Sequence, residues 1–181
     1  MPEGRAEIHD EDPFATPAEK RSPDRRFRGR LAAPVTIWTS GGSEGRTGLT
    51  VSSLLLAEGA PARILGLLND TTDIWDAIQG SGTFVVHILS VGDERLAERF
   101  AGSWPSPGGI FAGLDVEDSE HGPVLADQPD RAYCRFTGSS PEGWHQLVRG
   151  EIERLEFAAS PRPPLIHHRG AYPRLLEERS D

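Results

Sequence analysis

Arg46-Thr47-Gly48-Leu49-Thr50-Val51-Ser52-Ser53 is the stretch of sequence that decides the fold. It follows a Gly-rich turn at residues 40–45 and mixes β-branched residues with hydroxyl side chains, which is typical of a strand leaving a hairpin turn. Hydroxyls and backbone N–H groups at a strand edge donate several hydrogen bonds to a phosphate or a polyhydroxyl chain without a buried cation. An ordinary Thr- and Ser-rich hairpin strand explains the same residues equally well.

Runs of β-branched and aromatic residues on both sides of this stretch predict further strands. The run at 63–68 is almost continuously apolar, which predicts burial on both faces of that strand. A Gly-, Ser- and Pro-containing turn at 138–143 is expected to separate the last two strands. The predicted strands cover residues 35–39, 47–55, 63–68, 83–89, 110–116, 132–137 and 145–157.

Three short helices are predicted between these strands. One covers residues 24–32, and one covers 93–101, where Leu96 and Phe100 share a face. Another begins at Thr71-Thr72-Asp73, which has N-cap chemistry, and ends at Gly80-Ser81-Gly82. About seven strands with two or three short helices predict a mainly β fold, a small antiparallel barrel.

The length of 181 residues is enough for one domain with a sizeable core. With 20 Gly and 15 Pro, the composition favours a turn-rich β protein over a helix bundle. We expect a disordered or loosely attached arm at 1–23, a folded domain at 24–176 and a frayed tail at 177–181.

The formal net charge of −9 disfavours binding to nucleic acid or to an anionic membrane. Residues 20–30 are an exception, because they are strongly basic: they form either a contact for a partner or RNA, or a solvated segment. Cys134 is the single cysteine, so no intrachain disulfide forms and a cytoplasmic location is expected. No apolar run is long enough to span a bilayer. His167 and His168 are adjacent on a predicted strand and point to opposite faces, so no metal site is expected.

The order and spacing of these blocks resemble the flavin reductase-like family, which has an FMN-binding split β-barrel, antiparallel and Greek-key-like. The resemblance extends from about residue 27 to residue 175. It rests on seven blocks of sequence: PVTIWTS (34–40), RTGLTVSS (46–53), RILGLLNDTTDIWDAI (63–78), SGTFVVHIL (81–89), ERLAERFAG (94–102), EGWHQLVRGEIERLEF (142–157) and PPLIHHRGAYPRL (163–175).

This resemblance implies an oxidoreductase that binds FMN, with FAD as the alternative flavin, and that uses NAD(P)H as co-substrate. The expected activity is that of an NAD(P)H:flavin reductase supplying reduced flavin to a partner monooxygenase. A flavin carrier or sensor of the same fold, without turnover, is the alternative. The resemblance also implies a homodimer, with Trp38, Ile110 and Phe111 contributing to the contact between subunits.

The family pattern assigns flavin contacts residue by residue. Backbone groups and hydroxyls of the first strand are implied at the flavin ring and the ribityl phosphate, and Phe100-Ala101 lies against the flavin. Phosphate contacts fall on the run that opens a helix, and this agrees with the affinity of helix N-termini for anions. Arg169 reaches either the flavin phosphate, a neighbouring subunit or solvent. The implied cofactor residues are Thr50, Val51, Ser52, Ser53, Asn69, Thr71, Thr72, His87, Phe100, Ala101 and Arg169.

Two positions depart from the family pattern. His87 replaces a frequent Asn, and its imidazole is either a hydrogen-bond donor to the flavin or a structural core residue. Gly143-Trp144-His145 stands where relatives frequently have Gly-Asp-His. His145 is therefore the catalytic candidate on the nicotinamide side, while the missing acid and the Trp144 ring leave nicotinamide binding open.

Overall fold

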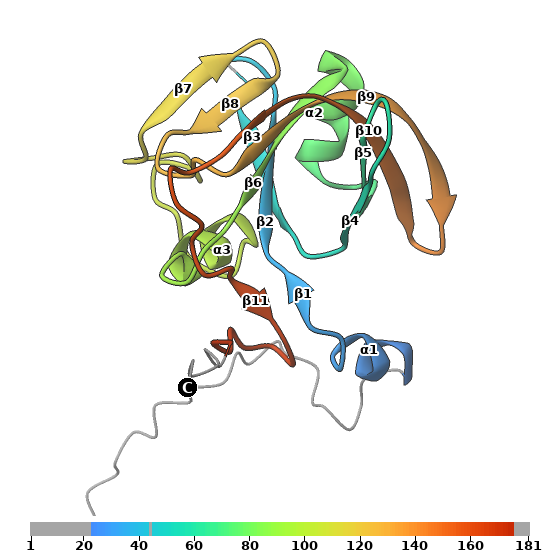
Figure 1. Ribbon diagram of the computed structural model, residues 1–181, viewed down its shortest axis with the longest axis vertical. Helices are drawn as coiled ribbons and strands as arrows, with labels where there is room; N and C mark the ends of the chain where they lie inside the picture. The colour runs from blue at the N-terminus through green and yellow to red at the C-terminus, as the bar shows by residue number, and fades with distance from the viewer. Residues whose placement is uncertain (1–22, 44, 176–181) are drawn as a thin grey trace, which may run out of the picture.

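The fold is built around a long hairpin formed by β9 (Arg131–Glu142) and β10 (His145–Glu156). The computed structural model describes residues 23–43 and 45–175, and Figure 1 shows the arrangement. Seven antiparallel strands form one curled sheet, half of a barrel, in the order β3-β2-β6-β9-β10-β5-β4. The other five strands of this sheet are β2 (Thr36–Ser40), β3 (Thr47–Val51), β4 (Leu54–Ala57), β5 (Arg63–Leu68) and β6 (Thr83–Ile88). The mainly β prediction is confirmed.

Two small pairings and three short helices complete the described part of the chain. Strand β7 (Val116–Ser119) pairs with β8 (Gly122–Leu125), and β1 (Ala33–Pro34) pairs with β11 (Ile166–His167). The helices are α1 (Pro23–Arg28), α2 (Asp73–Ser81) and α3 (Glu94–Phe100). Helix α2 covers the concave side of the sheet, and α3 lies at the other end of β2 and β3 (Figure 1).

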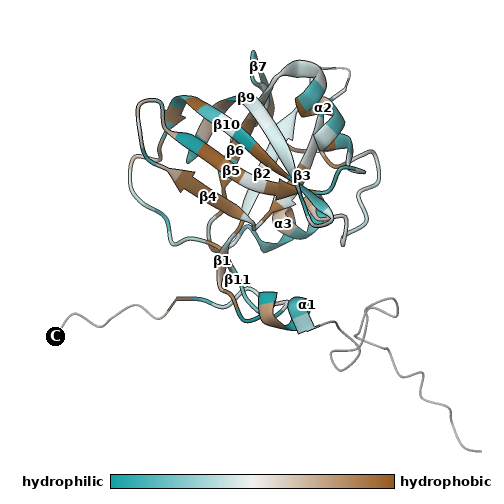
Figure 2. Ribbon diagram, turned by 90° about the vertical axis from the view of Figure 1, so that its right-hand side faces the viewer, coloured by the Kyte–Doolittle hydropathy of each residue, from teal (hydrophilic) through white to brown (hydrophobic). Residues whose placement is uncertain are grey.

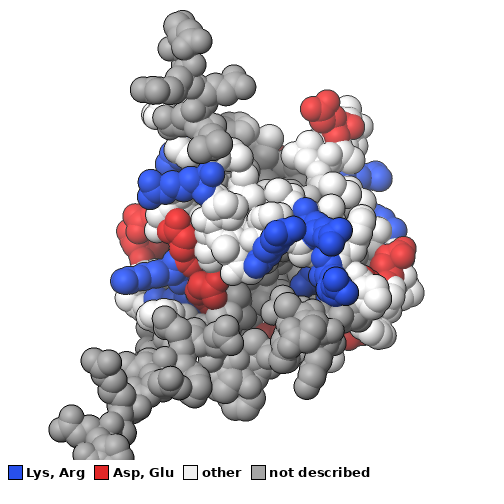
Figure 3. All heavy atoms as spheres, turned by 90° about the horizontal axis from the view of Figure 1, so that it is seen from below, with Lys and Arg blue, Asp and Glu red and all other residues white. Residues whose placement is uncertain are grey.

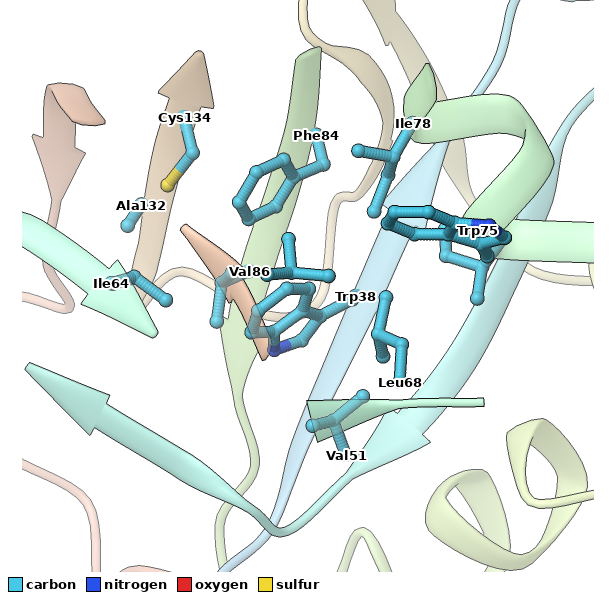
Figure 4. Packing of buried hydrophobic residues seen from close by; sticks show 12 residues of the cluster. Trp38, Val51, Ile64, Leu68, Trp75, Ile78, Phe84, Val86, Ala132 and Cys134 are labelled. Atoms are coloured by element: carbon cyan, nitrogen blue, oxygen red, sulfur yellow. The ribbon is translucent and has the colours of Figure 1, made fainter. Parts of the chain in front are cut away.

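The main core fills the inside of the curled sheet, where Trp38 stacks on Phe84 with ring centroids 4.8 Å apart (Figure 4). Both side chains are fully buried. Gly66 and Gly150 make room for the two rings, because a Cβ added at Gly66 would lie 2.6 Å from the indole and one at Gly150 would overlap Phe84. Trp38 therefore belongs to the interior of one subunit, which corrects its expected place in a contact between subunits.

A second apolar cluster lies between β2 and α3. It joins Ile37 and Leu89 to Ala97 and Phe100 of α3 and to Leu165 of the C-terminal segment. Tyr172 fastens this segment to α3, since its hydroxyl donates a 2.5 Å hydrogen bond to Glu98 Oε1. This cluster fixes the end of α3 beside the first strands of the sheet.

Several predicted boundaries differ from the structure. The predicted strand at 47–55 is two strands, β3 and β4, that pair with different neighbours, β2 and β5. The predicted strand at 110–116 is wrong, because turns occupy residues 108–114 and the strand begins at Val116. The predicted turn at 138–143 is also wrong: β9 continues to Glu142, with a register shift opposite Arg149 and Gly150, and the chain reverses at 143–144.

The burial of β5 also differs from the expectation. Its residues alternate between the core and the outside, and Leu67 remains 37% exposed. Core side chains cover the concave face of the sheet, whereas no described residue covers the outer face of β5. This strand is therefore buried on one face only. The other predicted strands and the two helices at 73–81 and 94–100 occur close to their predicted positions.

The basic segment begins outside the described residues and continues into α1. This helix carries Arg25, Arg26 and Arg28 and buries no residue. Seen from below, Lys and Arg side chains gather on this face of the molecule (Figure 3), at the end where α1 lies in Figure 1. The arm predicted at 1–23 and the tail predicted at 177–181 fall outside the described part of the chain, apart from Pro23.

Candidate functional site

A cavity of about 330 Å³ opens where β3 begins, α2 begins and α3 ends. Its volume lies within the range of sites that bind small molecules. Three segments that are distant in the sequence form its walls: Thr47, Gly48 and Leu49 from β3, residues 71–74 from the start of α2, and Arg99, Phe100, Ala101, Gly102 and Ile110 from the end of α3 and the following loop. We call this the rim cavity.

The start of α2 gives the rim cavity its polar wall. Thr72 is the N-cap residue, with extended backbone, but its side chain does not cap the helix. Its hydroxyl instead donates to the Asn69 carbonyl oxygen at 2.7 Å. The first-turn N–H groups of α2 therefore have no side-chain acceptor, and such groups at the positive end of a helix dipole favour an anion.

Asn69 and Thr71 hold the turn that leads into this helix. The side-chain oxygen of Asn69 accepts hydrogen bonds from the Thr71 N–H at 3.0 Å and from the Thr71 hydroxyl at 2.9 Å. Asn69, Thr71 and Thr72, three of the predicted phosphate contacts, are thus brought together on one turn. The carboxylate of Asp73 lies on the same wall, so an anion here meets one negative side chain as well as the helix end.

A close approach between β3 and α3 forms the opposite wall. A Cβ added at Gly48 would lie 2.7 Å from the Phe100 ring and 3.0 Å from the Trp38 carbonyl oxygen. Phe100 in turn meets Phe111 edge-on, with ring centroids 5.2 Å apart. Because only glycine fits at position 48, the β3 backbone reaches the cavity without a side chain in front of it. The predicted contacts Phe100 and Ala101 both line this wall.

Arg99 is the basic residue in the rim cavity wall, and it was not predicted as a site residue from the sequence. Its Nη2 donates to the carbonyl oxygens of Gly109 and Ala112, at 3.0 and 2.6 Å. Its Nε is buried without a hydrogen-bond partner, and within residues 23–43 and 45–175 no carboxylate pairs with the guanidinium. The charge of Arg99 is therefore available to an anionic ligand.

The predicted contacts at the end of β3 lie outside the rim cavity. Thr50 donates its hydroxyl to the Ala97 carbonyl oxygen of α3 at 2.6 Å, and Val51 is buried in the main core. The Ser53 hydroxyl exchanges hydrogen bonds with the Leu67 backbone, whereas Ser52 is exposed. Thr50 and Ser53 anchor this segment to α3 and β5, and none of the four residues lines the rim cavity.

His87 is a structural residue, which corrects its assignment as a flavin contact. Its side chain is fully buried; Nδ1 faces the Ile37 carbonyl oxygen at 3.2 Å and Nε2 accepts from the Leu125 N–H at 3.1 Å. Burial lowers the pKa of this imidazole to about 4, so it is neutral at pH 7. With both nitrogens engaged and no access to ligand, His87 ties β2, β6 and β8 together.

Arg169 and His145 are not among the residues that line the rim cavity. Arg169 is exposed and its backbone N–H donates to the Gly29 carbonyl oxygen, so the structure places it beside the end of α1. His145 begins β10, one residue before the pairing of Gln146 with Leu68. This position is near the end of β5 that leads into Asn69. The neighbouring Trp144 ring is 81% exposed.

No helix in the described part of the chain is long and apolar enough to cross a membrane.

Burial raises the pKa of the Cys134 thiol to about 12, so the single cysteine is protonated inside the core. The groups at the rim cavity are hydroxyls, helix N–H groups, bare backbone, one guanidinium and the Asp73 carboxylate, and they suit the binding of a ligand.

The chain matches the family described as the flavin reductase like domain over residues 28–176. It belongs to this family. The NADH-dependent FMN reductase AsuE2 of Streptomyces nodosus subsp. asukaensis is 32% identical over 171 residues, which are 93% of this chain and 91% of that protein. The reductase subunit HsaB of a flavin-dependent monooxygenase from Mycobacterium tuberculosis is 27% identical over 161 residues, 86% of this chain and 84% of that protein.

A solved structure with the same fold is nitrilotriacetate monooxygenase component B from Mycobacterium thermoresistibile. It superposes with a TM-score of 0.78 at 27% identity, and the match covers 87% of this chain and 88% of that one. The resemblance inferred from the sequence blocks is confirmed.

Proposed function

We propose that this protein is an NADH-dependent FMN reductase that passes reduced flavin to a separate monooxygenase. Membership of the family and the name of AsuE2 support FMN reduction with NADH as the electron donor. The names of HsaB and of component B, both parts of monooxygenase systems, support a monooxygenase as the partner. The observation that carries the proposal is the uncapped start of α2, with Thr71 and Thr72, facing a cavity whose opposite wall includes the bare backbone of Gly48. A cytoplasmic location belongs to the same proposal.

The residues present fit a flavin mononucleotide. The phosphate would bind at the start of α2, where it would accept hydrogen bonds from the first-turn N–H groups and from the hydroxyls of Thr71 and Thr72, which would turn to it from their present acceptors on Asn69. Arg99 offsets the charge that Asp73 adds to this wall. The backbone at Gly48 lies open to the rest of the flavin, because no side chain covers it. Two further hydroxyls lie near this backbone: that of Thr47, which lines the cavity, and that of Ser52, which follows β3 and is exposed.

When bound, flavin supplies the redox chemistry, accepting a hydride from the nicotinamide and releasing the electrons to an acceptor. The protein contributes position and charge. His145 orients the nicotinamide from the start of β10, as a hydrogen-bond donor to its carboxamide or phosphate. Residues on rigid strand ends suit this task, since a displacement of about 1 Å costs on the order of a hundredfold in rate.

The outer face of β4, β5 and β10 supports a homodimer. Strand pairing places Leu55 beside Leu65 and Leu67 beside Leu147, all pointing away from the core, and Leu55 is 70% exposed. Figure 2 shows this apolar character along β4 and β5. An exposed apolar face next to an edge strand is typical of an interaction surface, and we propose a second copy of the chain as the partner that covers it. Light scattering at micromolar concentration should give twice the monomer mass, and Leu55→Glu should give the monomer.

The activity is tested by following NADH oxidation at 340 nm with purified protein, with and without added FMN. Oxidation of NADH that requires FMN supports the reductase activity. The role of His145 is supported if His145→Ala slows this oxidation while it binds FMN as the wild type does. FMN binding without any oxidation of NADH or NADPH would assign the protein to the flavin carriers instead.

A further inference from the structure

A second cavity, of about 400 Å³, adjoins the rim cavity and is lined by side chains of a different kind. Arg99 lines both cavities, so the two meet at one guanidinium. The other walls of the second cavity include Arg95 from α3, Trp104 and the two prolines that flank Ser106, Pro105 and Pro107. We call it the Trp104 cavity.

Charge on α3 is divided between two faces of the helix. Glu94 and Glu98 are one turn apart and already engaged, Glu94 with the Gly92 N–H and Glu98 with the Tyr172 hydroxyl. Arg95 and Arg99 are also one turn apart, and like charges at this spacing repel each other. Within residues 23–43 and 45–175, neither arginine has an acidic partner. An anion in the Trp104 cavity would relieve this repulsion.

The Trp104 ring offers a flat surface beside these two cations. It is 56% exposed, although a ring of this size is usually largely buried in a folded protein. The loop that carries it is held in place, because Arg99 bonds the carbonyl oxygens of Gly109 and Ala112 and Phe111 packs on Phe100. Prolines on both sides of residue 106 restrict the backbone further. An exposed aromatic ring on a fixed loop is suited to stacking on a nucleobase.

We propose that the Trp104 cavity binds an adenosine diphosphate group, with the adenine on Trp104 and the phosphates at Arg95 and Arg99. Guanidinium groups pair with phosphates in a bidentate manner, and stacking holds the base. This inference rests on the proposed function, because NADH and FAD both carry this group. The shared Arg99 then lets one dinucleotide extend from the flavin-binding rim cavity into its neighbour.

The direct test is calorimetric titration of the purified full-length protein with ADP. Trp104→Ala and Arg95→Gln should each weaken ADP binding about tenfold, the loss expected for one stacked base or one charged contact. Phe157→Ala and Arg63→Gln are the matched controls, since each removes an exposed aromatic or arginine side chain that lines neither cavity. The controls should bind ADP as the wild type does.

Steady-state kinetics then separates the two sources of the group. If NADH places its adenosine diphosphate here, Trp104→Ala raises KM for NADH about tenfold with FMN as acceptor and leaves the ratio of FAD to FMN affinity unchanged. If FAD does so, the affinity for FAD falls about tenfold and KM for NADH stays constant.

Absence of ADP binding to the wild type, or equal affinity in Trp104→Ala and the wild type, overturns the inference even if NADH oxidation proceeds. Conversely, suppose that the wild type binds ADP through Trp104 and yet oxidises no NADH. That result would support the ADP site and contradict the proposed reductase activity. The thermal unfolding of each variant is recorded alongside, because these exposed side chains contribute little to stability.

Discussion

The interior of the curled sheet and the rim cavity are built by opposite means. Inside the sheet, large side chains pack together: Trp38 stacks on Phe84, and two glycines without side chains leave room for the rings. At the rim, helix N–H groups, a turn of hydroxyls and the bare backbone of Gly48 line the cavity beside the side chains of Arg99 and Phe100. The interior therefore sets stability and the rim sets binding, so substitutions in the two regions should separate these properties.

The largest effect is expected in the interior, at Gly150. Gly150→Val should lower the free energy of unfolding by more than about 3 kcal/mol, because its branched side chain would overlap the Phe84 ring in a filled core. Chemical denaturation followed by tryptophan fluorescence measures the change. The stacked Trp38 ring should also report the lost packing as a shift in emission.

Gly80→Ala is the matched control for this prediction. Gly80 lies within α2 with nothing within 4 Å of an added Cβ, so alanine should stabilise the helix by about 0.5–1 kcal/mol. Equal destabilisation by both substitutions would show that glycine at position 150 is not required by the ring stack.

The interior was largely predictable from the sequence, and the rim only in part. Strands such as β5 and β6 are found by their β-branched and apolar runs, because each packs on the concave side of one sheet. Strand β8 gave no signal, since its four residues, Gly122–Leu125, are all buried and include a proline, so no alternation appears.

The same contrast holds within the site. Thr71 and Thr72 were predicted because cap chemistry is local: the residues that open a helix are adjacent in sequence. Gly48 and Arg99 were missed because their roles come from the approach of β3 to α3, which no local pattern encodes. The spacing of Arg95 and Arg99, one helical turn apart without acids between them on that face, was the available signal.

A smaller effect in the interior should come from acid, through His87. Burial holds its pKa at about 4, below the value of 6.5 that it regains on unfolding. The unfolded state therefore takes up a proton first, and the protein loses stability as the pH falls from about 6.5 to 4. A shift of this size corresponds to roughly 3 kcal/mol.

Denaturation curves at pH 7 and pH 4.5 measure this dependence, with His87→Gln as the comparison. Glutamine does not titrate, so the variant should lose the His87 share of the acid sensitivity while retaining that of the carboxylates. An identical pH dependence in the two proteins would contradict the buried neutral imidazole.

The smallest effect in free energy is expected at the rim, where it should appear in binding alone. Thr72→Val removes the hydroxyl at the start of α2 and should weaken FMN by about tenfold or somewhat more, the loss expected for one hydrogen bond to an anion. Riboflavin, which lacks the phosphate, should lose almost nothing. Thr137→Val is the control, because its exposed hydroxyl bonds the Arg149 carbonyl oxygen on the β9–β10 hairpin. Fluorescence titration with both ligands decides: equal losses for FMN and riboflavin would place the phosphate away from α2.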